Sequence, residues 1–141
     1  MSLTIAVTED LETCFALRHQ VFVEEQGVPV EEEKDALDAS ATHLLALRDG
    51  VAVGTARIVF KGDTAKIGRV CVLTSARGTG LGAKLIEAAV ETARVRSGVA
   101  KAKLGAQIHA IGFYEKLGFT AFGPVYDDAG IDHRDMVRDF T

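Results

Sequence analysis

The chain has 141 residues, of which 48% are hydrophobic, and it carries a formal net charge of −4. This length and this apolar content suffice for a domain with a buried core, and they exclude a disordered chain. The negative charge excludes a general nucleic-acid binder, which needs a basic surface to neutralise phosphates. The sequence therefore predicts one domain over residues 1–141.

Hydropathy and cysteine usage predict a cytoplasmic protein. No apolar run is long enough to cross a bilayer, and the first residues, MSLTIAVTEDLE, lack the basic start and long apolar stretch of a signal peptide. Cys14 and Cys71 are too few for a disulfide framework and lack the spacing of metal ligands. We expect no membrane association, no bound metal and a reducing compartment.

The chain begins with a predicted strand and a predicted helix. LTIAV alternates apolar residues, as a half-buried strand does, and TEDLETCFALRHQVFVEEQ has helical period with a start signal at Thr8. The expected buried stripe of this helix consists of Leu11, Phe15, Arg18 and Phe22, widened by Cys14, Leu17 and Val21.

An acidic segment follows the helix. Seven acidic residues lie from Glu24 to Asp38, against the single basic residue Lys34. Two interpretations stay open. The segment is a solvated loop or irregular helix, as charge runs usually are, or it is an anionic rim beside a site for a cationic substrate.

From His43 onward the sequence predicts mixed α/β structure, with antiparallel strands first and a βαβ unit later. HLLALRDGVAVGTARIVFKGDTAKIGRVCVL contains three strands separated by the turns RDG and KGD. One face of the next helix, which ends near Gly98, carries Leu81, Leu85, Ala88, Ala89 and Thr92. AKLGAQ is then a short strand, AIGFYEKLG a short helix stopped by Gly118, and FTAFGPVY and HRDMVRDF are the final strands.

Three glycines, Gly78, Gly80 and Gly82, lie where a strand becomes the long helix. A glycine-rich turn there exposes backbone N–H groups at the positive end of the helix dipole, where phosphate binds. A P-loop is excluded because Gly82 is followed by AKL, which places no hydroxyl for magnesium. The dinucleotide fingerprint fails because the next strand comes too late and no acidic residue closes it.

The remaining pattern is Arg-x-x-Gly-x-Gly at Arg77, Gly80 and Gly82, which resembles the pyrophosphate loop of the GNAT superfamily of acetyl-coenzyme A-dependent acyltransferases. RVCVLTSARGTGLGAKLIEAA is similar to the core motif of that family, and AQIHAIGFYEKLGF to its second signature. RHQVFVEEQGVP and DAGIDH resemble a subgroup of small bacterial proteins known mostly as predicted acetyltransferases. The resemblance covers nearly the whole chain. It implies the GNAT acyl-CoA N-acyltransferase fold, with a mostly antiparallel central sheet, a βαβ cofactor-binding unit and helices on both faces.

The resemblance also implies how acetyl-coenzyme A (acetyl-CoA) binds. Loop amides from Arg77 to Ala83 would hold the pyrophosphate, with Lys84 as a further source of charge, and backbone groups near Val72 would bind pantetheine and stabilise the oxyanion. The expected cofactor-binding residues are Val70, Cys71, Val72, Arg77, Gly78, Thr79, Gly80, Leu81, Gly82, Ala83, Gln107 and Tyr114. The Cys71 thiol is expected to be buried on the other face of the sheet and to carry no acyl group.

Catalysis requires an acid and a base. Tyr114, placed near the thioester sulfur by the resemblance, is the expected general acid, because a phenol with a pKa near 10 can supply a proton to the departing thiolate. The base is not assigned, since TAKIGRVCVL lacks the glutamate that many family members carry in this strand. Its candidates are Glu25, His43 and His133, with bulk water as a further option.

These features predict an N-acetyltransferase that moves the acetyl group from acetyl-CoA to a primary amine, on a small molecule or a lysine side chain, by direct attack. The alternative is a non-catalytic CoA- or acyl-CoA-binding sensor or interaction module. The expected partners are acetyl-CoA and an amine acceptor, with a cationic acceptor and a homodimer as options. No nucleic acid, membrane or metal is expected as a partner.

Overall fold

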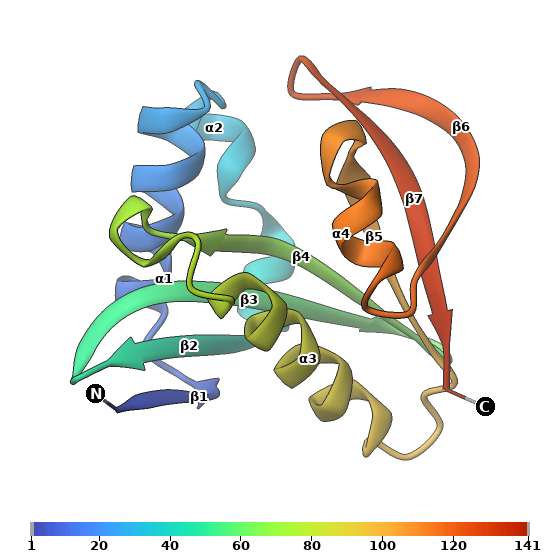
Figure 1. Ribbon diagram of the computed structural model, residues 1–141, viewed down its shortest axis with the longest axis horizontal. Coiled ribbons are helices and arrows are strands. Elements are labelled where there is room, and N and C mark those ends of the chain that lie inside the picture. Colours follow the sequence, from blue (N-terminus) through green and yellow to red (C-terminus); the bar gives the residue numbers. More distant parts are fainter. Residues whose placement is uncertain (1, 141) are drawn as a thin grey trace.

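The computed structural model describes residues 2–140, through which one seven-stranded sheet runs in the order β1-β2-β3-β4-β5-β7-β6 (Figure 1). The strands are β1 (Leu3–Thr8), β2 (Thr42–Arg48), β3 (Val51–Lys61), β4 (Thr64–Val72), β5 (Lys101–Gln107), β6 (Thr120–Asp128) and β7 (Ile131–Asp139). Neighbouring strands are antiparallel except for β4 and β5, which are parallel. The predicted fold class is confirmed.

Helices connect and cover the strands. They are α1 (Leu11–Arg18), the π-helical η1 (His19–Glu25), α2 (Val30–Glu33), η2 (Ala36–Ala39), η3 (Thr74–Ala76), α3 (Leu81–Arg94), η4 (Ile108–Ala110) and α4 (Ile111–Glu115). Helix α3 joins β4 to β5 and forms the predicted βαβ unit. Within residues 2–140, none of the helices has the length and apolar character required to cross a bilayer.

Two hydrophobic cores lie on opposite faces of the sheet. Leu44 and Ala46 of β2 belong to the larger core, which α3 covers, whereas Leu45 packs with Cys14 and Leu17 of α1. Because side chains alternate between the faces of a strand, α1 and α3 must lie on different sides. Helices therefore cover both faces, as the sequence predicted.

The first helix differs from its prediction in its start and its buried face. Thr8 ends β1, and Asp10 caps α1 by accepting a hydrogen bond from the Thr13 N–H at 3.2 Å. The residues buried from this helix and η1 are Cys14, Leu17, Arg18 and Val21. Phe15 is turned to the edge of this stripe, where its ring centroid lies 4.9 Å from the Arg18 guanidinium carbon. The helix is thus rotated toward the side on which Arg18 finds buried partners.

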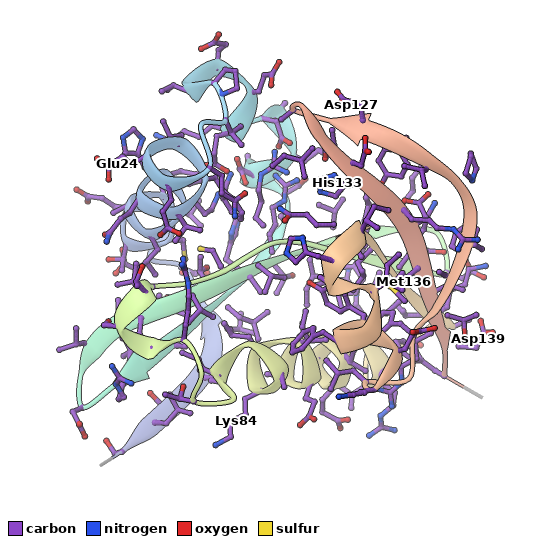
Figure 2. The ribbon with its side chains drawn as sticks, turned by 45° about the horizontal axis from the view of Figure 1, so that its top comes forward. Glu24, Lys84, Asp127, His133, Met136 and Asp139 are labelled. Carbon is purple, nitrogen blue, oxygen red and sulfur yellow. The ribbon has the colours of Figure 1, made fainter. Side chains whose placement is uncertain are left out.

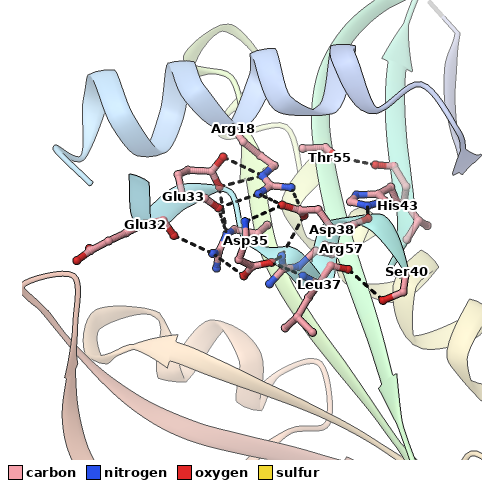
Figure 3. A network of polar contacts seen from close by, with 12 residues as sticks. Arg18, Glu32, Glu33, Asp35, Leu37, Asp38, Ser40, His43, Thr55 and Arg57 are labelled. Atoms are coloured by element: carbon pink, nitrogen blue, oxygen red, sulfur yellow. Dashed lines mark hydrogen bonds and ion pairs between the residues drawn. The ribbon is translucent and has the colours of Figure 1, made fainter. Parts of the chain in front are cut away.

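A buried ion cluster joins the acidic segment to the sheet (Figure 3). It contains three arginines and three carboxylates, namely Arg18, Glu33, Asp35, Asp38, Arg57 and Arg69. Arg18, only 1% exposed, donates from Nε to Glu33 at 2.9 Å and from Nη1 to Asp38 at 2.8 Å. Arg57 of β3 donates to Asp35 at 2.8 Å and to Asp38 at 3.0 Å. Each buried charge therefore has an opposite charge within hydrogen-bond distance.

The ion cluster revises both interpretations of the acidic segment. Three of its carboxylates are neutralised by arginines rather than solvated, and a fourth, on Glu25, is paired with Arg77. Glu24 projects from the outer side of its helix, away from the rest of the molecule (Figure 2). An anionic rim, if the segment forms one, can involve only its remaining acids, Glu31 and Glu32.

Replacement of Asp38 by asparagine should destabilise the fold, because Arg18 and Arg57 would lose a shared buried counter-charge. Breaking a buried ion pair typically costs about 3–5 kcal/mol. Urea denaturation at neutral pH measures this loss. Asp139→Asn, at an exposed position near the end of β7, is the control and should change the unfolding free energy little.

The Asp38→Asn variant should also show that the contribution of Asp38 to the unfolding free energy depends on pH in the acid range. Burial opposes ionisation of Asp38, but hydrogen bonds from Arg18, from the Asp35 N–H and from Arg57 outweigh it and lower the pKa of this carboxyl. A lowered folded-state pKa contributes stability that is complete above the unfolded pKa of about 4 and is lost as the pH falls below it. The stability difference between the native protein and Asp38→Asn should therefore shrink below about pH 4. A difference that stays constant down to acid unfolding would contradict this assignment.

Candidate active site

The site begins where β4 and β5 separate. They pair only from Thr64 to Lys66, against Lys101 to Lys103, and then diverge (Figure 1). A bulge in β4 accompanies the separation. The β3 partners step from Thr55 to Arg57 while the β4 partners step from Cys71 to Gly68, so β4 has one extra residue here. Bulges bend a strand and increase its twist, which explains why β4 turns away from β5.

Arg69 lies at the bulge with a backbone φ of +50°, a conformation that side-chain-bearing residues adopt rarely. Its Nε donates to the Glu33 carboxylate and to the Glu33 carbonyl, both at 3.0 Å. Glu33 is itself held by Arg18. The ion cluster thus stabilises the unusual backbone of the bulge that opens the sheet.

A cavity of about 390 Å³ occupies the split between the strands. Its wall includes Lys66 to Val70 of β4, Leu104, Gly105 and Gln107 of β5, Glu32 and Glu33 of α2, Tyr114 of α4, and Tyr126, Asp128 and His133 of the β6–β7 hairpin. The structure therefore brings together four of the predicted cofactor-binding and catalytic residues: Val70, Gln107, Tyr114 and His133.

The glycine loop lies at the N-terminus of α3. Gly78 and Gly80 have φ of +76° and +82°, which glycine adopts without strain. The first backbone hydrogen bond of α3 runs from the Lys84 N–H to the Gly80 carbonyl at 3.2 Å, so the three preceding N–H groups have no partner inside the helix. A Cβ added at Gly78 or Gly80 would meet no atom within 4 Å. The loop thus presents free N–H groups on an open surface, which fits a bound phosphate.

The polar side chains of this loop are engaged elsewhere. Arg77 donates to both carboxylate oxygens of Glu25, at 2.7 and 2.9 Å, and to the Val72 carbonyl at 3.0 Å. Thr79 Oγ1 donates to the Ala76 carbonyl at 2.6 Å and closes the loop. Lys84 projects outward from α3 (Figure 2). With Arg77 engaged by Glu25, the groups that this loop presents on its open surface are backbone N–H groups.

Tyr114 lines the cavity and packs between two other aromatic rings. Its ring makes edge-to-face contacts with Phe113 and Phe119, at centroid distances of 5.1 and 6.1 Å. Burial raises the pKa of Tyr114, so the phenol stays protonated near neutral pH. Among the described residues its hydroxyl has no hydrogen-bond partner and is free to donate to a ligand in the cavity.

The three candidate bases have different environments. Glu25 lies outside the cavity wall, where the hydrogen bond from Arg77 lowers the pKa of its carboxyl and makes it a weaker base. His43 is 3% exposed and also lies outside the wall, with Nε2 3.0 Å from the Asp38 carbonyl. His133 alone of the three lines the cavity.

Cys71 faces away from the split. It is 4% exposed and packs in the smaller core beside Cys14. Burial raises the pKa of the Cys71 thiol to about 12, so its reactive thiolate is scarce at neutral pH. Only its backbone can border the cavity.

The sequence did not predict several residues of the cavity wall, above all Tyr126, Asp128 and Arg69. A signal for the first two was present. The turn between the last two strands fixes the register of a hairpin, which places Tyr126 opposite His133. No local pattern indicated Arg69, because its partner Glu33 lies 36 positions away in the chain.

Within residues 2–140 no group of three His, Cys, Asp or Glu side chains could hold a metal ion.

Comparisons with known proteins agree on one family. The family profile described as Acetyltransferase (GNAT) domain matches residues 7–140. A Bacillus subtilis (strain 168) protein provisionally named an acetyltransferase is 42% identical over 137 residues, which cover 95% of this chain and 92% of that protein. The uncharacterised N-acetyltransferase YjcF of the same strain is 38% identical over 132 residues, covering 93% of this chain and 94% of its own length. The crystal structure of an acyl-CoA N-acyltransferase from Pseudomonas aeruginosa has a TM-score of 0.88 at 34% identity, covering 97% of this chain and 99% of that chain.

The burial of both cysteines predicts that they resist thiol reagents in the folded protein. Cys14 is 0% exposed and Cys71 is 4% exposed, and burial raises the pKa of each thiol. A chromogenic disulfide reagent should label neither cysteine at neutral pH and both after denaturation. Rapid labelling of native Cys71 would restore it as a possible acyl carrier.

Proposed function

The chain belongs to the GNAT acetyltransferase family, as its motifs predicted, and on that premise we propose that it transfers the acetyl group of acetyl-CoA to a primary amine. One observation carries the proposal. The cavity holding Tyr114 is lined by β4 from Lys66 to Val70, and the open glycine loop at the start of α3 follows the C-terminal end of that same strand. A ligand with a phosphate at one end and a reactive thioester at the other suits this arrangement.

Acetyl-CoA would be held mainly by backbone groups. The free N–H groups of Leu81, Gly82 and Ala83 would bind the pyrophosphate at the positive end of the helix dipole. Beyond Lys66, β4 has no ladder with β5, and there its backbone would hydrogen-bond the pantetheine arm. A backbone N–H near Val72 would stabilise the oxyanion that forms when the amine attacks. Tyr114 would donate a proton to the departing thiolate.

The cavity wall favours an acceptor with additional positive charge. Glu32 of α2 and Asp128 of the hairpin are both exposed, and neither carboxylate has a basic partner among the described residues. Lys66 is one opposing charge in the wall, whereas Arg57 and Arg69 are paired within the ion cluster. The unpaired charges of the wall therefore sum to a negative value, which attracts cationic amines.

The second candidate function is a CoA-binding sensor without turnover. The glycine loop would serve either function equally well. Tyr114 lines the cavity, and its hydroxyl has no hydrogen-bond partner within residues 2–140, which supports catalysis because a sensor needs no proton donor.

Incubation of the protein with acetyl-CoA and a panel of mono- and polyamines should release free thiol and yield an acetylated amine detectable by mass spectrometry. Gly80→Leu should abolish both this activity and the rise in melting temperature caused by acetyl-CoA, because its side chain would occupy the phosphate site. Gly98→Leu is a matched control. Its φ of +83° imposes the same backbone strain just beyond the C-terminal end of α3, and a Cβ there also meets no atom within 4 Å.

The outcomes separate the two functions. A thermal shift without thiol release for any amine would favour the sensor. No shift at millimolar acetyl-CoA would remove the donor assignment altogether. Equal loss in both leucine variants would attribute the effect to strain rather than to the phosphate site.

Tyr114→Phe should preserve the ring, its packing and acetyl-CoA affinity while deleting the proton. General acid catalysis is typically worth about 100-fold to 10,000-fold, so kcat should fall by that order with the KM for acetyl-CoA little changed. A thioester with a more acidic thiol should recover part of the loss, because its thiolate leaves without help. A native kcat in Tyr114→Phe would show that another group or water supplies the proton.

A further inference from the structure

We infer that His133 is the general base of this site and that Tyr126 positions it, an inference that rests on the proposed amine acetylation. A primary amine with a pKa near that of lysine, about 10, is almost entirely protonated at neutral pH and has no lone pair for attack. The acceptor nitrogen must therefore lose a proton before it attacks, and a base held in the cavity would accept that proton at the site of reaction. Strand β4, TAKIGRVCV, contains no acidic residue, so a protein base would come from another element.

Strand pairing places His133 in the cavity wall. Its cross-strand neighbours are Gln107 on β5 and Tyr126 on β6, and all three line the cavity. Figure 2 shows His133 on the side of β7 that faces the N-terminal helices. The imidazole thus borders the same space as the Tyr114 phenol.

A hydrogen bond to the backbone determines which ring nitrogen of His133 can accept a proton. His133 Nδ1 lies 2.7 Å from the Ile131 carbonyl oxygen. Because a carbonyl only accepts, Nδ1 must carry the hydrogen, and in the neutral ring Nε2 then holds the lone pair. Among residues 2–140, Nε2 has no hydrogen-bond partner. It is therefore free to accept a proton from a ligand.

Tyr126 fixes the plane of the ring. The two rings stack with a centroid distance of 6.0 Å and an interplanar angle of 24°. The Tyr126 hydroxyl donates to Asp135 at 2.7 Å, and it lies so close to Gly105 that any Cβ at that position would overlap it. Tyr126 is thereby anchored across β7 and β5. Burial first, and then Asp135, raise the pKa of Tyr126, so it stays protonated and is not itself the base.

The other titratable groups of the wall are less suited to this role. Glu33 is held by two arginines, and Arg57 and Arg69 are permanently charged donors. Glu32 and Asp128 are exposed carboxylates, which are weak bases at neutral pH. The charged residues on the two flanking strands and on β7 itself include Lys103 of β5, Asp128 of β6 and Asp135 of β7, and Lys103 Nζ lies 3.6 Å from Asp135. Lys66 of β4 is a further charged residue of the cavity wall. Histidine is the side-chain type that changes charge near neutral pH, which suits it to general base catalysis.

His133 and Tyr114 together account for the proton transfers of the proposed reaction. His133 Nε2 takes one proton from the acceptor ammonium, and the freed lone pair forms the N–C bond to the thioester carbonyl. Collapse of the tetrahedral intermediate breaks the C–S bond, and the sulfur leaves with that electron pair and takes a proton from Tyr114. The acetylated nitrogen then loses its second proton, which returns to Tyr114 through solvent, while His133 gives its proton to bulk water.

The test compares pH profiles of native protein, His133→Asn and the control His109→Asn, in which an exposed histidine of η4 is changed. Asparagine can keep a donor near the Nδ1 position while removing Nε2. In native protein kcat/KM should fall as the pH drops, because a protonated imidazole cannot accept. His133→Asn should lower kcat/KM about 100-fold to 10,000-fold and remove this acid limb, with the acetyl-CoA thermal shift intact. His109→Asn should match the native profile.

A Tyr126 variant and an NMR titration of His133 provide two further tests of the inference. Tyr126→Leu removes the stacked ring and should lower kcat while retaining the acid limb and the KM for acetyl-CoA. If His133→Asn fails to fold, an NMR titration of His133 in native protein should have the same midpoint as the acid limb. An unchanged acid limb in folded His133→Asn, or mismatched midpoints, would overturn the inference while leaving acetyl transfer standing. Absence of transfer by native protein with every amine would remove the proposed function and this inference with it.

Discussion

The separation of β4 from β5 is the constraint on which the rest of the molecule depends. Two adjacent parallel strands would normally satisfy each other's backbone groups along their whole length. Here the ladder ends at Lys66, and a bulge at Arg69 directs β4 away from its neighbour. The cavity exists because of this divergence, and the backbone groups released from the ladder become available to a ligand. Helix α3 begins just beyond β4, so its free N–H groups lie along the continuation of the same strand.

The ion cluster explains how an opened sheet remains folded. Arg69 needs partners that hold its left-handed backbone, and Glu33 supplies both a carboxylate and a carbonyl. Arg18, at the C-terminal end of α1, binds the same carboxylate, so the helix, the acidic segment and the bulge form one unit. Buried ion pairs often add little net stability compared with apolar packing. In this protein the cluster also holds the Arg69 side chain and so the bulge in place, which is a geometric contribution separate from any net gain in stability.

Local patterns predicted much of the fold and part of the site. Alternation, turn residues and helical period predicted the strands, the βαβ unit and α3, and the glycine spacing identified the loop at Gly80. The buried face of α1 could not be predicted in the same way, because Arg18 is drawn inward by carboxylates far along the chain. The Arg77–Glu25 pair spans 52 positions and had no local signal either. The neighbourhood of His133 depended on hairpin register, which becomes apparent only when the last two strands are aligned about their turn.

An NMR titration with acetyl-CoA tests most directly the claim that the split in the sheet is the donor site. Backbone amide resonances of Gly78 to Ala83, of Val70 to Val72 and of Gly105 to Gln107 should shift together as the ligand saturates, because each group borders the proposed path of the cofactor. Amides of β1, at the far edge of the sheet, should not move. Saturable binding that leaves the glycine loop and the amides of Val70 to Val72 unperturbed would contradict the claim.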